Sequence, residues 1–489
     1  MLHRLAALLI AATGFAQLAL YQEPFRPQFH FSPARNWTND PNGLVYFEGE
    51  YHLFFQFNPF GDRWGHMSWG HAVSRDLVHW RELPVALPEE NGVMIFTGST
   101  VVDQHNSSGF CTASKACMVA IYTGHTPETK SHPALQTQNI AYSNDRGRSW
   151  TKYPQNPVLD LHMSDFRDPK VVWSESAKRW VMVVAFPNDH KVRFYGSSDL
   201  KHWQQLSDFG PAGAASGQWE CPELFELPIE SKPGQTRWVL KIGLNPGALQ
   251  GGSGEQYFVG QFDGSRFIND NPAGVTLWTD YGKDCYCALT FNNLPRTQSQ
   301  VMLGWMNNWQ YAGDVPTQPW RGQMTVPRKI ALRETPEGLR LVQNPIDALA
   351  QLRSSWRPGS DVFELKVEAP LGNAKELGWK LRNAGETFSL IGFDRDNQQL
   401  FVDRTHSGAT NFSKDFPART TAPLHLTGNE LRLHILVDRS SVEIFAEDGL
   451  IAITNLIFPP LGAREVEFYS KGGQSGAIQT KRWTLNSIW

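Results

Sequence analysis

The sequence is poor in several features that would point to particular classes of protein. Its formal net charge is only -3, so it lacks the basic surface that nucleic acids or anionic membranes require. Five cysteines in 489 residues are too few for a disulfide scaffold. Hydrophobic residues make up 41% of the chain and charged residues 19%, which excludes a disordered protein. The length indicates two or three globular domains, and neither nucleic acid nor membrane is expected as a partner.

The N-terminus is the only apolar run of note. Arg4 precedes about 12 mostly apolar residues from Leu5 to Ala16, below the ~18–20 needed to span a bilayer. The small residues Gly14 and Ala16 are suited to cleavage, so residues 1–16 are predicted to be a secretory signal peptide rather than a buried or membrane helix. The protein is expected outside the cell, or in the periplasm if it is bacterial.

The cysteines give no metal-site pattern. Cys111 and Cys117 lie six residues apart in a polar segment and could pair outside the cell. For Cys285 and Cys287 we expect a strand with both thiols on one face, because no matching Cys/His pair offers zinc spacing. His66, His71 and His79 also lack metal-ligand spacing, and neither a metal nor an organic cofactor is expected.

Short apolar or alternating runs recur along the chain, and helical periodicity is almost absent. Clusters of Gly, Pro, Asn or Asp bound each run, which is typical of many short antiparallel strands. The clearest runs are Leu44–Phe47, Tyr51–Phe57, Val119–Tyr122, Val171–Trp173, Trp180–Phe186 and Trp238–Ile242. The sequence therefore predicts an all-β protein, with a hairpin turn between Phe47 and Tyr51.

An internal repeat favours a propeller for the first part of the chain. A serine, an aspartate two residues later and a tryptophan four or five residues beyond recur at Ser74, Ser143 and Ser197. In each copy the Ser-x-Asp turn can bond its own backbone and the tryptophan can fill the space beside the strands. The copies lie ~55–70 residues apart, close to the size of a four-stranded propeller blade with its loops.

The pattern changes near residue 350. Ile346–Arg357 includes a short stretch with helical character, and alternating strands such as Leu431–Val437 and Val442–Phe445 follow it. Such half-buried hairpins are typical of a β-sandwich, so a domain boundary is expected here.

Three carboxylates stand in proline-containing segments beside apolar strands. They are Asp40 in Trp-Thr-Asn-Asp-Pro-Asn-Gly, Asp168 in Phe-Arg-Asp-Pro and Glu220 in Trp-Glu-Cys-Pro. Each segment is expected to be a turn, in which proline restricts the backbone and fixes the carboxylate. The alternative is that Asp40 and Asp168 only cap turns through Asx hydrogen bonds.

Glycosidase chemistry uses two carboxyl groups, one as nucleophile or base and one as acid. Glu220 suits the acid because Trp219 and Cys221 would desolvate it and Glu223 adds like charge. Asp168 beside Arg167 is expected to stay ionised and to hold substrate hydroxyls. Asp40, in its Asn-rich turn, suits the nucleophile.

These motifs, in this order and spacing, resemble the β-fructofuranosidases of glycoside hydrolase family 32. The resemblance runs from about Pro27 to the C-terminus and is greatest to microbial exo-levanases and exo-inulinases, through segments such as Trp64–His71 and Leu303–Tyr311. It implies a five-bladed β-propeller over residues 27–345 and a C-terminal β-sandwich over residues 357–489. It also implies retaining hydrolysis of terminal non-reducing β-fructofuranosides in levan, inulin and sucrose.

The resemblance also implies roles for individual residues. Asp40 would be the nucleophile, Glu220 the acid/base and Asp168 the stabiliser of the transition state. Further positions match those that line the fructose pocket in such enzymes: Asn39, Gln56, Trp64, Phe96, Thr97, Ser99, Arg167 and Trp309.

Three other functions remain open from the sequence. An inverting pentose glycosidase on a similar propeller would hold its carboxyl groups ~6.5–9.5 Å apart, against ~5–5.5 Å for retention. A fructosyltransferase would use the same residues but pass fructose to a sugar. A non-catalytic sugar-binding propeller would usually lack one of the three acids, and all three are present. The sequence does not give the oligomeric state.

Overall fold

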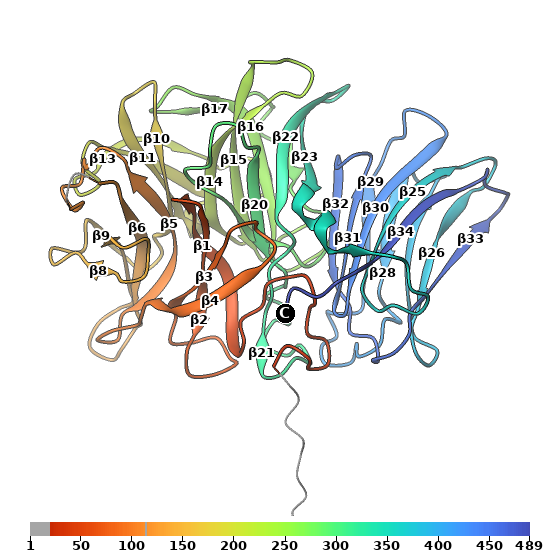
Figure 1. Cartoon of the computed structure of the whole chain (residues 1–489). Coiled ribbons are helices and arrows are strands. Elements are labelled where there is room, and N and C mark those ends of the chain that lie inside the picture. The colour runs from red at the N-terminus through yellow and green to blue at the C-terminus, as the bar shows by residue number, and fades with distance from the viewer. Residues whose placement is uncertain (1–19, 113–114) are drawn as a thin grey trace, which may run out of the picture.

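The computed structural model describes residues 20–112 and 115–489, and the segment predicted as a signal peptide lies outside them (Figure 1). The predicted all-β fold is confirmed: besides strands, the described residues form only two short 3-10 helices, η1 (Pro187–Asp189) and η2 (Asp347–Leu352). Over that part of the chain, no helix has the length and apolar character needed to cross a bilayer.

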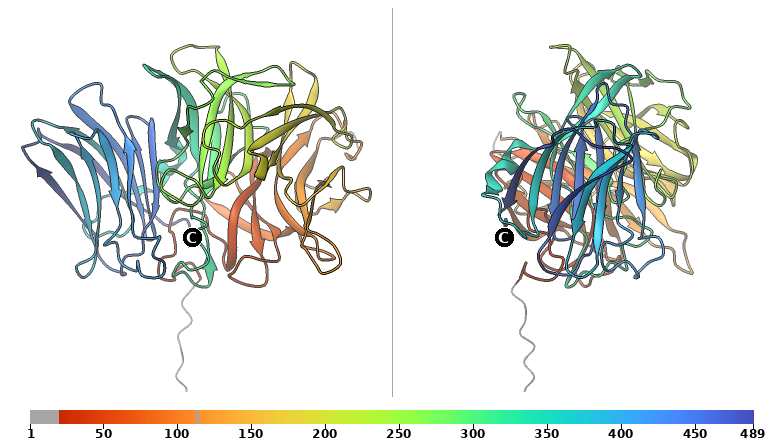
Figure 2. Two further views of the ribbon diagram at one scale, coloured as in Figure 1. Left: turned by 180° about the vertical axis from the view of Figure 1, so that it is seen from behind. Right: turned by 90° about the vertical axis from the view of Figure 1, so that its right-hand side faces the viewer.

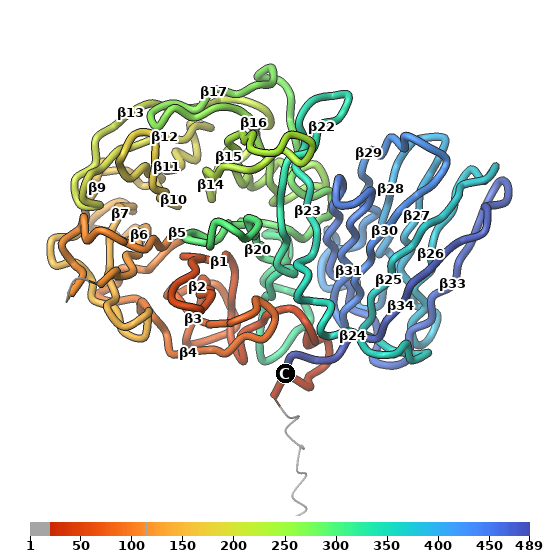
Figure 3. The backbone as a smooth tube through the Cα atoms, turned by 45° about the horizontal axis from the view of Figure 1, so that its top comes forward, coloured from red at the N-terminus to blue at the C-terminus, as the bar shows by residue number. Residues whose placement is uncertain are grey.

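Five sheets surround a common centre and form the five-bladed propeller (Figures 1 and 3). The first strand of each sheet is the innermost, and each innermost strand contacts the next around the ring, with the fifth contacting the first. The innermost strands are β1 (Asn36–Phe47), β5 (Met94–Asp103), β10 (Arg167–Ser174), β14 (Gln218–Pro228) and β19 (Tyr286–Thr290). The sheets are numbered blades I to V in the order of these strands. A further strand, β21 (Trp320–Arg321), pairs in parallel with β1 of blade I, although in sequence it lies between two strands of blade V.

The remaining propeller strands lie outward of these five in sequence order. Blade I continues with β2 (Glu50–Asn58), β3 (Ser68–Ser74) and β4 (Trp80–Leu87), and blade II with β6 (Cys117–Thr126), β7 (Leu135–Ser143), β8 (Thr151–Lys152) and β9 (Leu159–Met163). Blade III continues with β11 (Arg179–Phe186), β12 (Lys191–Ser197) and β13 (Gln204–Phe209). Blade IV continues with β15 (Thr236–Asn245), β16 (Gly254–Phe262), β17 (Phe267–Asn269) and β18 (Leu277–Trp278), and blade V with β20 (Gln300–Trp305), β22 (Arg328–Thr335) and β23 (Gly338–Pro345).

All six runs predicted as strands lie within strands, and the Phe47–Tyr51 hairpin is confirmed by the pairing of Phe47 with Glu50. The Ser-x-Asp repeat marks one position in three successive blades, the turn from the third strand to the fourth. In every copy the serine hydroxyl bonds the aspartate and the tryptophan indole donates to a backbone carbonyl within the turn. The repeat is therefore a blade marker, as its spacing predicted.

Each innermost strand carries a β-bulge near its N-terminal end, where its register with the second strand shifts. The shifts fall between Thr38/Pro41, Ile95/Gly98, Arg167/Lys170, Glu220/Glu223 and Tyr286/Leu289. The expectation that the three acidic motifs are turns between strands is wrong, since they lie in these bulges. Proline has no N–H for the ladder, so Pro41, Pro169 and Pro222 favour a bulge at these points.

The C-terminal part is a two-layer sandwich packed against the propeller (Figure 2). One sheet contains β24 (Arg353–Ser354), β34 (Gln479–Leu485), β25 (Phe363–Pro370), β30 (Glu430–Asp438), β31 (Ser441–Ala446) and β32 (Ile451–Leu456). The other contains β29 (Arg419–Pro423), β28 (Gln399–Asp403), β27 (Phe388–Asp394), β26 (Glu376–Arg382) and β33 (Glu465–Lys471). Apolar side chains from both sheets fill the space between them.

Candidate active site

The bulges bring the three predicted carboxylates together from three blades. Asp40, Asp168 and Glu220 lie near the N-terminal ends of β1, β10 and β14. Cys221 connects them, because its Sγ lies 3.8 Å from Asp40 Oδ2, its N–H donates to Asp168 Oδ2 at 2.9 Å and it follows Glu220 in the chain. Three carboxyl groups around one cysteine form a site for acid–base chemistry.

Asp40 is buried, and its two oxygens differ in their hydrogen bonds. Thr97 Oγ1 on β5 donates to Asp40 Oδ2 at 2.7 Å, whereas Oδ1 has no hydrogen-bond partner among the described residues. Burial, with a smaller contribution from the Glu220 charge, raises the pKa of Asp40 to about 6, although the Thr97 hydrogen bond opposes this shift. A carboxylate with one anchored and one unpartnered oxygen is suited to nucleophilic attack.

Asp168 is held by its backbone conformation and by a neighbouring blade. Its φ is +65°, in the left-handed region, and its N–H donates to Thr123 Oγ1 at 3.0 Å. Burial raises the pKa of Asp168 to about 7, and the opposing effect of Arg167 is not large enough to prevent this. Burial thus has a larger effect on the pKa of Asp168 than the Arg167 charge, and ionised Asp168 as the group that holds substrate hydroxyls stays a prediction.

Arg167 forms its ion pair with Glu220. Its Nη2 and Nε lie 2.9 and 3.2 Å from Glu220 Oε1, and the hydroxyl of Tyr286 donates to Oε2. Both oxygens of Glu220 are thereby oriented, while 19% of its side chain stays exposed. Burial raises the pKa of Tyr286 well above its usual range, so this hydroxyl keeps its proton.

The expected source of like charge on Glu220 is neutralised. Glu223 is buried and lies 3.0 Å from the Nζ of Lys170, and it also accepts hydrogen bonds from Thr290. Its charge is thus balanced by a lysine within the propeller core. The charged group that contacts Glu220 directly is Arg167 instead.

An aromatic rim lies beside the carboxylates on blades I and II. Trp64 is 47% exposed and packs edge-on against Phe96, which stacks on His125 with ring centres 4.4 Å apart. Phe96 directly precedes Thr97, so this rim lies next to the nucleophile candidate. Exposed indole faces of this kind are suited to contact with the apolar face of a sugar.

The other predicted pocket residues have defined places. Asn39 is buried and accepts a hydrogen bond from the Trp37 indole at 2.8 Å, and Trp309 stacks on the same indole. Gln56 on β2 donates to the Ile95 carbonyl. The Ser99 hydroxyl accepts the Val171 N–H at 2.9 Å, so Ser99 joins β5 to β10.

Sequence reasoning missed Tyr286 and misjudged the cysteines around it. Cys287 forms a disulfide with Cys221, whereas Cys285 is a buried free thiol in a different apolar cluster. The expectation of two thiols on one face is wrong, because the bulge of β19 rotates the chain between them. The available signal was the Cys-Tyr-Cys run itself, which lies at the fifth bulge.

The sulfur atoms of Cys221 and Cys287 lie close enough to Asp40 to raise the question of a metal site. Ligand atoms of Asp40, Cys221 and Cys287 lie within 4.8 Å of one another. Because the two sulfurs are bonded to each other, neither offers the thiolate that a metal would need.

Comparisons with known proteins identify the family of the chain. The models of the N-terminal and C-terminal domains of glycosyl hydrolases family 32 match residues 30–345 and 331–484. A levanase of Bacillus subtilis is 46% identical over 97% of this chain and 72% of its own length. The extracellular exo-inulinase of Aspergillus awamori is 40% identical over 96% of both chains.

Solved structures show the same likeness. The crystal structure of the Aspergillus awamori exo-inulinase superposes with a TM-score of 0.91 at 38% identity, covering 96% of this chain and 100% of that one. A β-fructofuranosidase of Schwanniomyces occidentalis complexed with fructosyl-erythritol has a TM-score of 0.85 at 32% identity, covering 96% and 99%.

Proposed function

The chain belongs to glycoside hydrolase family 32 and is a glycoside hydrolase, and from this premise we propose that it is a secreted, retaining exo-β-fructosidase. Its substrates are the terminal non-reducing β-fructofuranosyl residues of fructans and sucrose. The relatives named levanase and extracellular exo-inulinase support both the substrate class and the location outside the cell.

The observation that carries the proposal is the convergence of Asp40 and Glu220 on Cys221, with one Asp40 oxygen unpartnered. In the first step Asp40 Oδ1 attacks the anomeric carbon of the fructosyl residue. The bond to the leaving oxygen breaks, and that oxygen takes a proton from Glu220. A fructosyl ester of Asp40 and a free alcohol result.

In the second step water replaces the aspartate. Glu220, now ionised, removes a proton from water as the water oxygen attacks the anomeric carbon, and the ester bond to Asp40 breaks. Asp168 contacts the fructose hydroxyls and stabilises the positive charge that develops on the ring in both transition states. Arg167 orients Glu220 for both steps through its contacts with Oε1.

The aromatic rim and the buried amides supply sugar recognition. Trp64 offers an exposed apolar face, and Asn39 and Gln56 offer amide groups beside the nucleophile strand. With Thr97, Phe96 and Trp309 they would bind one terminal fructose, which accounts for the proposed action from the chain end.

Fructose release from levan, inulin and sucrose, measured side by side, tests the proposal. Asp40→Asn and Glu220→Gln are each expected to reduce release by at least about a thousandfold while the thermal unfolding midpoint stays near that of the wild type. Near-native turnover in either variant would contradict the assigned roles. Absence of fructose release by the wild type on all three substrates would contradict the function.

Two further measurements address the finer claims. In aqueous methanol a retaining enzyme forms methyl β-fructofuranoside from its covalent intermediate, whereas an inverting enzyme, which forms no such intermediate, does not. Products at high sucrose distinguish hydrolysis from transfer, since a transferase would yield fructosylated sucrose. Secretion is tested by expressing the full chain and locating the activity and the mature N-terminus in the medium or periplasm.

A further inference from the structure

A disulfide joins the innermost strands of blades IV and V inside the candidate active site. Cys221 and Cys287 lie at the bulges of β14 and β19, with φ of 47° and 46° and Cα atoms 5.5 Å apart. Both are nearly completely buried, at 2% and 0% exposure. The cross-link therefore fixes the relative position of two bulges rather than a surface loop.

The residues directly before the two cysteines also contact each other. Glu220 precedes Cys221, Tyr286 precedes Cys287, and the Tyr286 hydroxyl donates to Glu220. The disulfide and this hydrogen bond thus close a small ring between β14 and β19. Movement of either cysteine would displace the carboxyl group that donates and accepts the proton.

Cys221 also contacts the two other acids. Its N–H donates to Asp168 Oδ2 at 2.9 Å, and its Sγ lies 3.8 Å from Asp40 Oδ2. A disulfide sulfur carries no hydrogen, so the contact with Asp40 removes water without donating a hydrogen bond. A free Cys221 thiol at the same place could donate to Asp40, and such a bond to the ionised form lowers the pKa of a carboxylate.

We propose that the Cys221–Cys287 disulfide is a positioning element of the fructosidase reaction, which holds Glu220 in place and denies Asp40 a thiol donor. The inference rests on the proposed function, because it is read through fructose release. Cys287 is completely buried, so it acts as a positioning residue through its bond to Cys221.

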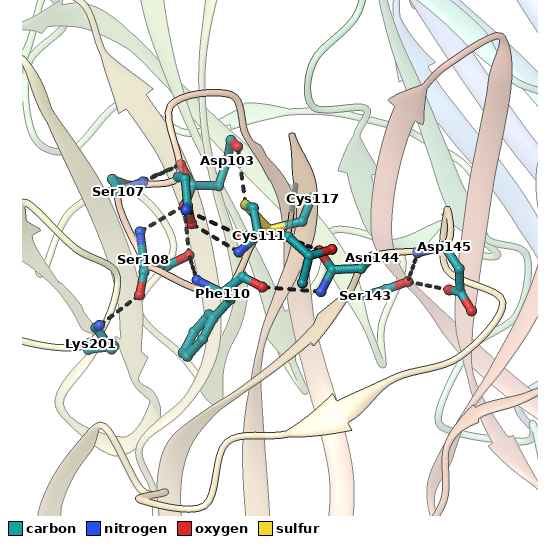
Figure 4. Close-up of a disulfide and its surroundings, with 12 residues drawn as sticks. Asp103, Ser107, Ser108, Phe110, Cys111, Cys117, Ser143, Asn144, Asp145 and Lys201 are labelled. Carbon is teal, nitrogen blue, oxygen red and sulfur yellow. Dashed lines mark hydrogen bonds between the residues drawn. A yellow bond between two sulfur atoms is a disulfide. The ribbon is translucent and has the colours of Figure 1, made fainter. Parts of the chain in front are cut away.

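The chain offers a matched control. The disulfide between Cys111 and Cys117 lies at the other end of blade II, where Cys117 pairs with Asp103, and its surroundings are serine and asparagine side chains rather than the three acids (Figure 4). Removing this disulfide also removes a covalent cross-link. It leaves the contacts around Glu220 unchanged.

The test compares Cys287→Ala, the double variant Cys221→Ala/Cys287→Ala and the control Cys111→Ala/Cys117→Ala on sucrose. Peptide mapping without reduction first verifies the two cross-links in the secreted wild type. Cys287→Ala is expected to lose about tenfold to a hundredfold in kcat with KM within about twofold, as expected for a displaced catalytic group. The control is expected to keep the wild-type kcat.

The pH profile separates the two parts of the proposed role. In Cys287→Ala the free Cys221 thiol is expected to move the acid limb of kcat/KM down by about one pH unit. The double variant lacks the thiol, so its acid limb should return to the wild-type position while its kcat stays low. Rescue of the limb without rescue of kcat is a result that general loss of stability would not produce.

If Cys287→Ala does not fold, chemical reduction of the Cys221–Cys287 disulfide tests the same role without a substitution in the site. The control variant treated with dithiothreitol contains only the Cys221–Cys287 disulfide to reduce, and it should then show the same fall in kcat and the same shift of the limb. The inference is overturned if a variant or treatment that breaks this cross-link leaves kcat and the acid limb as in the control. It is also overturned if mapping finds no such cross-link. Failure of the wild type to release fructose would instead contradict the proposed function.

Discussion

At the scale of single residues, sequence motifs located the acids but not their partners. Asp40, Asp168 and Glu220 could be found because proline follows each acid within two residues. Their surroundings come from other blades: Arg167 pairs with Glu220, and Tyr286, 66 residues further along, donates to it. Such partners depend on blade order and strand register, which no local pattern encodes.

The pH dependence of activity follows from the state of Asp40. Burial raises the pKa of Asp40 to about 6, and the carboxyl group must be ionised to attack. Below about pH 6 the group is protonated, so kcat/KM on sucrose is expected to fall at least about tenfold per pH unit. A profile measured from pH 4 to 9 checks this, and a flat acid side down to pH 4 would contradict it.

Thr97 offers a variant that should move the same limb. Its hydroxyl stabilises ionised Asp40, so Thr97→Val is expected to shift the acid limb of kcat/KM to higher pH. Thr100→Val is the matched control, because Thr100 is a buried threonine on the same strand whose hydroxyl has no partner within the described residues. Equal profiles for the two variants would show that the Thr97 hydrogen bond does not tune the nucleophile.

The Tyr286 hydroxyl orients the acid, and Tyr286→Phe removes only that hydroxyl. We expect kcat on sucrose to fall about tenfold with KM little changed, because Glu220 Oε2 loses its donor. On a fructoside with a nitrophenol leaving group, which needs little protonation, the loss should be much smaller. Equal losses on both substrates would contradict this role, and Tyr142→Phe, which stacks on Phe110 in blade II, serves as the control.

At the scale of strands, the site is a property of five equivalent bulges. Alternating apolar residues and the Ser-x-Asp repeat made the strands and blades predictable. The bulges were not predicted, because proline and glycine near the strand ends are equally compatible with turns. The side chains that the bulges present differ from blade to blade, and this difference turns a symmetric scaffold into an asymmetric site.

Gly98 tests the bulge of β5. A Cβ at this position would lie 2.1 Å from the Ile121 carbonyl oxygen and 2.7 Å from Tyr122 Cα, so β5 would have to move away from β6. Gly98→Ala is therefore expected to lower the thermal unfolding midpoint and to weaken the bond from Thr97 to Asp40, which shifts the acid limb upward. Gly274→Ala, which has open space around its Cβ, should change neither quantity.

At the scale of the whole molecule, buried charges join the sandwich to the propeller. Arg328 on β22 bonds both Asp280 in the propeller and Glu443 on β31, and all three side chains are buried. His30, from the segment before β1, lies 2.8 Å from both Asp438 and Glu443. These contacts hold the sandwich beside the propeller, so the two parts should unfold together.

His30 makes this interface sensitive to alkaline pH. Burial alone would lower the pKa of His30, but the hydrogen bonds that His30 donates to Asp438 and Glu443, and the charges of these carboxylates, outweigh burial and raise it from 6.5 to about 9. Protonated His30 stabilises the folded protein fully below pH 6.5, and this stabilisation is lost as pH rises through 9. Protonation of His30 thereby contributes about 3 kcal/mol to the free energy of unfolding at low pH.

The thermal unfolding midpoint of the wild type is therefore expected to fall between pH 6.5 and 9.5. His30→Gln should have a lower midpoint at pH 6.5, because Asp438 and Glu443 lose their cation, and a smaller fall toward pH 9.5. His202→Gln removes an exposed histidine that pairs with Asp199 and should behave like the wild type. If His30→Gln and the wild type lost the same amount over this range, protonated His30 would not be what holds the two domains together at neutral pH.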